Sequence, residues 1–71
     1  MTVQLKHLPI EHLSREAQHL WLWVARVDAD RMGRAYIEAE MISRRCRMTV
    51  AQARDAIAEL LKVGAMVEVE A

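Results

Sequence analysis

Apolar side chains recur at helical spacing between residues 14 and 27, and this pattern predicts the first helix. The predicted buried stripe consists of Leu13, Ala17, Leu20, Trp21, Val24 and Val27. Residues three and four apart share one face of a helix, so the stripe indicates a helix with one buried face. Ser14 is a suitable N-cap, and Glu16 falls in the first turn, where the helix dipole favours an acid. Leu22 projects from the opposite face, and Trp23 lies at the edge of the stripe.

The second half of the chain predicts two shorter helices, over residues 38–46 and 49–63, joined by a tight turn. Thr49 and Gln52 have the spacing of a capping box, in which each side chain bonds the backbone N–H of the other residue. Gly64 suits the left-handed conformation that ends a helix. The apolar positions expected to be buried are Ile42, Cys46, Ala53, Ile57, Leu60 and Leu61. This order of elements is a helix-turn-helix pattern.

Strand-like alternation is confined to short segments. Residues 66–70 alternate between apolar and acidic side chains and predict a strand after the third helix. Residues 34–37 are long enough for another short strand. Residues 1–13 are expected to form an N-terminal extension, in which Val3 and Leu5 give the weak pattern of an edge strand.

Length and composition predict a single, mainly α-helical domain over residues 1–71. Hydrophobic residues make up 54% of the chain, which is typical of a globular protein. No apolar run approaches the roughly 20 residues that cross a bilayer, and the N-terminus lacks the features of a secretory signal peptide. These features predict a cytoplasmic protein without membrane association. Cys46 is the single cysteine, so no internal disulfide is expected.

The formal net charge of zero conceals an uneven distribution along the chain. Residues 31–54 carry six arginines against two glutamates, whereas residues 55–71 carry one lysine against four acids. The basic block coincides with the helix-turn-helix pattern, where a surface that faces phosphate is expected. A solvated surface is the alternative explanation of the same charges.

The helix-turn-helix segment resembles a known superfamily at ten positions. These positions are Ile42, Ser43, Cys46, Met48, Thr49, Ala53, Ile57, Leu60, Gly64 and Met66. On these residues the chain resembles the winged helix-turn-helix superfamily, in particular GntR-type regulators and the N-terminal domains of phage and plasmid replication initiators. The resemblance spans residues 14–69 and implies a three-helix winged helix-turn-helix with a short or truncated β wing. Because only five residues follow Met66, the wing is expected to be absent, truncated or completed by another molecule.

The pattern and the resemblance together imply DNA binding in transcription or replication control, with the third helix in the major groove. Gln52 would pair with an adenine edge, and Thr49 and Arg54 would contact phosphate. The side chains expected to flank the groove are Arg44, Arg45 and Arg47. The capping box explains Gln52 equally well, so both interpretations of that residue stay open. The module is expected to act as a homodimer, because one copy buries too little surface to be highly specific.

Several positions depart from the family pattern. Arg47 stands where the family usually has a glycine in the turn. Glu40, Val50 and Ala51 stand where DNA-binding members often present basic or hydroxyl side chains. These departures weaken the surface that would read bases.

An alternative function is a protein–protein interaction module of the same fold. It is supported by the neutral overall charge, by Val50 and Ala51 on the third helix, and by the acidic residues Glu68 and Glu70 on the final strand. A small phage-type inhibitor or adaptor that binds a host protein is one such module. Its contact surface would include Leu22 and Trp23, because tryptophan is enriched at the energetic centres of interfaces. Packing in the core is the competing interpretation of Trp23.

Neither a metal site nor a catalytic site is expected. The histidines His7, His12 and His19 and the thiol of Cys46 show no compact metal-ligand spacing. The chain has no Gly-rich phosphate loop and no arrangement of a nucleophile with a base. The sequence therefore predicts a protein that is not an enzyme and needs no cofactor.

Overall fold

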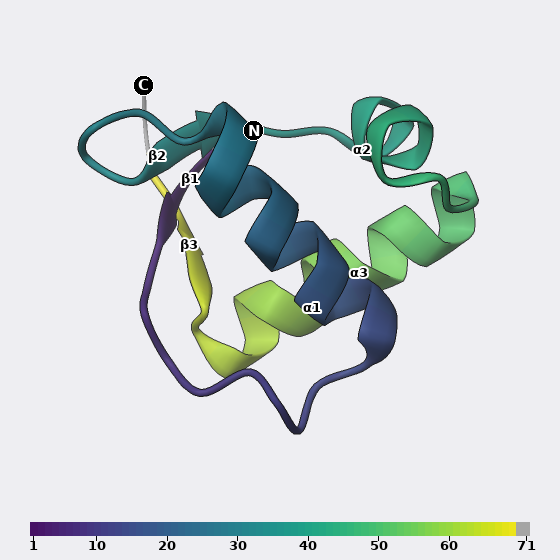
Figure 1. Cartoon of the computed structure of the whole chain (residues 1–71), viewed down its shortest axis with the longest axis horizontal. Helices are drawn as coiled ribbons and strands as arrows, with labels where there is room; N and C mark the ends of the chain where they lie inside the picture. The colour runs from purple at the N-terminus through teal and green to yellow at the C-terminus, as the bar shows by residue number, and fades with distance from the viewer. Residues whose placement is uncertain (70–71) are drawn as a thin grey trace.

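Three α-helices and a small antiparallel sheet make up the computed structural model, which describes residues 1–69 (Figure 1). The elements in chain order are β1 (Thr2–Leu5), α1 (Arg15–Trp23), the π-helical turn η1 (Val24–Asp28), β2 (Arg34–Tyr36), α2 (Ala39–Cys46), α3 (Val50–Val63) and β3 (Met66–Glu68). The sheet lies on one side of the molecule and α2 on the other, with α1 and α3 between them (Figure 1). Within residues 1–69 no helix is both long and apolar enough to span a membrane.

The first helix begins as predicted but ends differently. The Ser14 hydroxyl accepts a hydrogen bond from the backbone N–H of Ala17 at 3.1 Å, which makes Ser14 the N-cap. After Trp23 the chain continues as η1, where the N–H of Ala29 bonds the carbonyl of Val24 at 2.8 Å. This bond spans five residues rather than four, so the later side chains are rotated relative to an α-helix. The predicted burial of Val27 is therefore wrong, because 55% of that residue is exposed.

The two later helices agree with the predicted ranges to within one residue. Thr49 caps α3, and Gly64 ends it in the left-handed conformation with φ of 82°. Most of the predicted core of these helices is confirmed, namely Ile42, Cys46, Ala53, Ile57 and Leu60. Leu61 is only partly buried and packs against this core. The spacing of residues in the sequence was sufficient to predict both helices. Helix caps and the buried faces of helices depend on residues within one or two turns of each other.

The N-terminal segment corrects the prediction of an edge strand in an extension. The strand order is β2-β1-β3, with antiparallel pairing on both sides, so β1 is the central strand. Val3 lies opposite Ala35 in β2 and Glu68 in β3, and Leu5 lies opposite Met66. Alternation identified the inward face of β1 correctly, since Val3 and Leu5 are buried. It could not identify the neighbours of β1, which are contributed by distant parts of the chain.

The strand β3 has its partner within the molecule, because it pairs with β1. The N–H of Lys6 donates to the carbonyl of Ala65 at 2.9 Å, and the N–H of Val69 donates to Thr2 at 2.9 Å. The N-terminal strand of the same chain therefore pairs directly with β3. The predicted strand over 66–70 is observed over Met66–Glu68, and Glu70 lies outside the described residues.

One continuous core joins the sheet to the helices. It includes the inward residues of the sheet and the buried stripes of all three helices, with Val3, Leu20, Ile37, Ile42, Leu60 and Met66 fully buried. The indole N–H of Trp21 donates to the carbonyl of Ala65 at 3.1 Å, so its one polar atom is satisfied inside this core. This bond ties α1 to the segment that follows α3.

Candidate nucleic-acid interface

The turn between α2 and α3 is closed by Ser43 and Arg47. Arg47 adopts the left-handed conformation, with φ of 55° and ψ of 50°, and its N–H donates to the carbonyl of Ser43. The Ser43 hydroxyl donates to the carbonyl of Met48 at 2.6 Å, and the N–H of Met48 returns to the Ser43 carbonyl at 3.1 Å. A non-glycine residue therefore makes this turn in the left-handed conformation. Arg47 is exposed at this turn between the two helices.

Thr49 and Gln52 form the capping box that their spacing predicts. The N–H of Thr49 donates to Gln52 Oε1 at 2.9 Å, and the N–H of Gln52 donates to Thr49 Oγ1 at 3.0 Å. A bidentate contact between Gln52 and an adenine edge would also need the Gln52 carbonyl oxygen. The principal role of Gln52 in this conformation is therefore to start α3.

The predicted arginines are all exposed, but they differ in their partners. Arg45 Nη1 lies 2.6 Å from Asp28 Oδ1, so Arg45 joins α2 to the end of η1. Arg54 Nη2 lies 3.9 Å from Glu40 Oε1, and both side chains are more than half exposed, which makes this pair weak. Arg44 and Arg47 form no ion pair with any of residues 1–69. Acidic side chains therefore leave most of the positive charge around the α2–α3 turn unneutralised. This charge lies mainly on Arg44, Arg47 and Arg54.

A shallow hollow adds Arg15 to this basic group. The hollow has a volume of about 440 Å³ and lies between the first half of α1 and the α2–α3 turn. Its lining residues are Arg15, Glu16, His19, Cys46, Arg47, Met48 and Gln52. Arg15 and Arg47 are 32 positions apart in the chain, so no local signal in the sequence indicates that they lie near each other. The packing of α1 against α2 and α3 brings them together.

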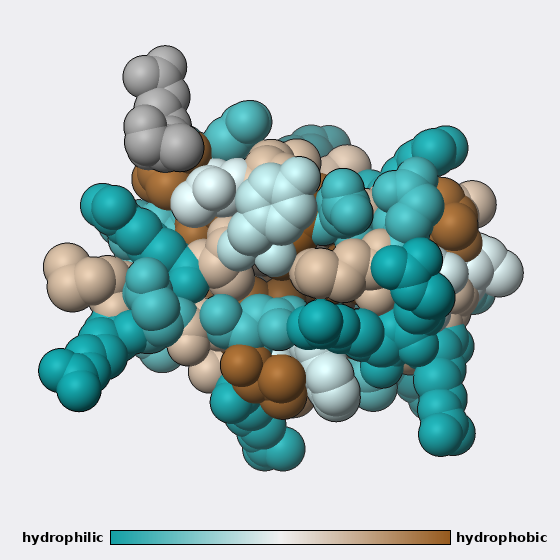
Figure 2. Space-filling model, turned by 90° about the horizontal axis from the view of Figure 1, so that it is seen from above, coloured by the Kyte–Doolittle hydropathy of each residue, from teal (hydrophilic) through white to brown (hydrophobic). Residues whose placement is uncertain are grey.

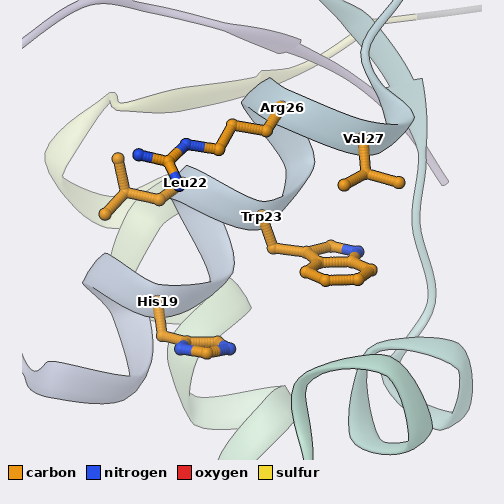
Figure 3. Close-up of a pocket in the computed structure, with 5 residues that line it drawn as sticks. All are labelled: His19, Leu22, Trp23, Arg26 and Val27. Atoms are coloured by element: carbon orange, nitrogen blue, oxygen red, sulfur yellow. The ribbon is translucent and has the colours of Figure 1, made fainter.

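Leu22 and Trp23 are not among the residues that line the hollow at the α2–α3 turn, and they project to different sides of α1 (Figure 3). Leu22 is 43% exposed, and Trp23 is partly buried against the core. Both line a second hollow with His19, Arg26 and Val27. The predicted placement of Leu22 outside the core and of Trp23 at its edge is confirmed.

Cys46 belongs to the core. Burial raises the pKa of the Cys46 thiol, and the nearby charge of Asp28 adds to this effect. A thiol with a raised pKa is a poor nucleophile near neutral pH. Within residues 1–69 no three side chains of the His, Cys, Asp and Glu types converge in a way that could hold a metal ion.

Comparison with known proteins finds no match to a family model, to a curated protein or to a solved structure.

Proposed function

We propose that this chain is a small winged-helix DNA-binding protein that acts in transcription or replication control, with α3 in the major groove. Two helices joined by a tight turn, a capped second helix and an antiparallel sheet beside them support this proposal. In this arrangement β1 supplies the strand that a wing would otherwise contribute after β3.

The observation that carries the proposal is the group of exposed arginines around the start of α3. Arg47 projects from the turn, Arg15 lines the same hollow, and Arg44 lies one turn earlier on α2. The first turn of a helix also leaves backbone N–H groups without partners in the helix, and its dipole favours an anion. Exposed guanidinium groups beside such an end suit the phosphates of a duplex.

Base contacts would fall on the exposed residues of α3 that the capping box does not occupy. Ala51 is exposed in the first turn, where its methyl group suits the methyl group of thymine. Arg54 is exposed one turn later, and its weak pairing with Glu40 at 3.9 Å leaves it able to contact guanine. These two positions, rather than Gln52, are where base preference is proposed to arise.

Fluorescence anisotropy with a labelled random-sequence duplex tests this function. At low salt the protein is expected to bind, with affinity that falls as salt rises. Arg44→Ala and Arg47→Ala should each weaken binding to all sequences and lower the salt slope by about 1. Arg31→Ala is the matched control, because Arg31 is also exposed but lies in the loop before β2, on the opposite side of the molecule from α2 (Figure 1). Absence of binding at low salt, or an equal loss with Arg31→Ala, would contradict the proposal.

A further inference from the structure

An apolar hollow on the exposed side of α1 and η1 carries a second inference, which is independent of DNA binding. Its lining residues are His19, Leu22, Trp23, Arg26 and Val27. His19, Trp23 and Val27 follow one another along one face, while Leu22 and Arg26 project beside them (Figure 3). Leu22 is 43% exposed and Val27 is 55% exposed. Hydrophilic side chains dominate the face of the molecule that Figure 2 shows, where the hydrophobic patches are small and separate.

The π-helical turn is what brings Val27 to this surface. An uninterrupted α-helix would continue the stripe of Leu20 and Val24 and turn Val27 toward the core. The five-residue bond between Ala29 and Val24 rotates the end of the helix instead. Turns of this kind are uncommon and occur frequently at functional sites. The fold therefore exposes an aliphatic side chain that the sequence pattern would have buried.

The two tryptophans differ in how their indole N–H groups are satisfied. Trp21 donates to the carbonyl of Ala65 at 3.1 Å. Trp23 Nε1 is buried and makes no hydrogen bond with any residue in the described range 1–69. A buried donor without an acceptor is energetically unfavourable. The apolar ring of Trp23 therefore lines the hollow. Its Nε1–H has no hydrogen-bond acceptor among residues 1–69.

The size of the hollow indicates the kind of occupant. Its volume is about 270 Å³, which is below the roughly 300–1,000 Å³ of typical small-molecule sites. One or two side chains of another protein would fill it. An amphipathic helix presents such side chains at i, i+3, i+4 and i+7.

The charge around the hollow indicates the polar part of the occupant. Arg26 and His19 are the titratable residues among its lining residues, and both are exposed. Arg26 forms no ion pair with another of residues 1–69, and Asp28, the nearest acid along the chain after it, is paired with Arg45. A partner with carboxylates beside its apolar anchors would complement this surface.

We propose that the hollow of His19, Leu22, Trp23, Arg26 and Val27 is a docking site for an acidic amphipathic helix of a partner protein. The apolar anchors of that helix would cover Leu22, Trp23 and Val27. One of its carboxylates would pair with Arg26.

NMR titration with two designed peptides tests the proposal. Both peptides have about 20 residues, enough for appreciable helix in isolation, with leucines at the four anchor positions. One carries glutamates on its remaining face, and the other carries lysines there. The glutamate peptide is expected to shift the Trp23 indole N–H resonance of the full chain in a saturable manner. The Trp21 resonance should move little, because its hydrogen bond lies in the core.

Exposed positions provide variants that keep the fold. Arg26→Glu should weaken binding of the glutamate peptide roughly tenfold and strengthen binding of the lysine peptide. Leu22→Ala should also weaken binding roughly tenfold, whereas Leu8→Ala, at a residue 45% exposed outside the hollow, should not. An unchanged Trp21 resonance verifies the fold of each variant.

Three outcomes would overturn the proposal. The first is that neither peptide shifts the Trp23 resonance. The second is equal binding of the two peptides, because it removes the role of charge. The third is that the Trp23 resonance shifts with protein concentration in the absence of peptide and that sedimentation shows self-association. The hollow would then bind a second copy of this chain.

Discussion

Ser14 and Glu59 are joined by two hydrogen bonds, although 45 positions separate them in the chain. The backbone N–H of Ser14 donates to Glu59 Oε2 at 2.9 Å, and its hydroxyl donates to Glu59 Oε1 at 2.6 Å. The same hydroxyl accepts from the N–H of Ala17 at 3.1 Å, which caps α1. One serine therefore starts the first helix and also attaches it to α3.

Replacing Ser14 by Ala removes both uses of the hydroxyl. We expect the free energy of unfolding to fall by about 1 kcal/mol or more, since loss of a serine N-cap alone has about this effect. Urea denaturation measures the change. Ser14→Thr is the control, because its hydroxyl can still cap the helix and reach Glu59. A loss as large in Ser14→Thr would show that the hydroxyl is not the cause.

The ionisation of Glu59 should make part of the stability depend on pH. The Ser14 hydroxyl, and then the Ser14 backbone N–H, hold the pKa of the Glu59 carboxyl below its ordinary value. The folded-state pKa is the lower one, so the ionised form stabilises the fold. This contribution is complete above the ordinary glutamate pKa and is lost as pH falls through the lowered one.

Urea denaturation of the native protein and of Glu59→Gln at several pH values tests this dependence. The native protein is expected to be the more stable near neutral pH, and the difference should shrink steadily in acid. A difference that stays constant across the acidic range would mean that the carboxylate charge is not involved.

Arg47→Gly should raise the stability of the fold while it lowers the affinity for DNA. Arg47 has φ of 55°, a conformation that disfavours side chains and that glycine adopts readily. We expect the variant to unfold with a free energy about 1 kcal/mol higher and to bind duplex DNA more weakly, because it lacks the guanidinium group. Thermal unfolding and anisotropy measure the two effects. Weaker DNA binding together with lower stability would point to damage of the turn instead.

Two substitutions of similar shape on β1 test its central position. Val3→Thr places a hydroxyl on the fully buried face between Ala35 and Glu68. We expect this change to lower the free energy of unfolding by roughly 1–3 kcal/mol. Thr2→Val lies on the outer face of the sheet and should change the free energy by less than about 0.5 kcal/mol. Circular dichroism during urea denaturation measures both, and similar effects at the two positions would contradict the inward orientation of Val3.

Features that act over a few residues could be predicted from the sequence. The Ser14 cap, the capping box of Thr49 and Gln52 and the helix end at Gly64 each depend on groups within one turn, so their spacing was sufficient. The exposed position of Leu22 likewise follows from the period of an α-helix.

Features that depend on distant segments required the tertiary structure. The alternation of Val3 and Leu5 marked a strand face, but only its pairing with β2 and β3 made β1 central. The approach of Arg15 to Arg47 and the pairing of Arg45 with Asp28 arise from helix packing. Val27 left the predicted stripe because the last turn of that helix formed five-residue bonds. The sequence by itself determined where the three helices start and where α2 and α3 stop, because those energies are local. The fold decided the neighbours of each strand and the partners of each charge, because those contacts exist only once distant residues have packed together.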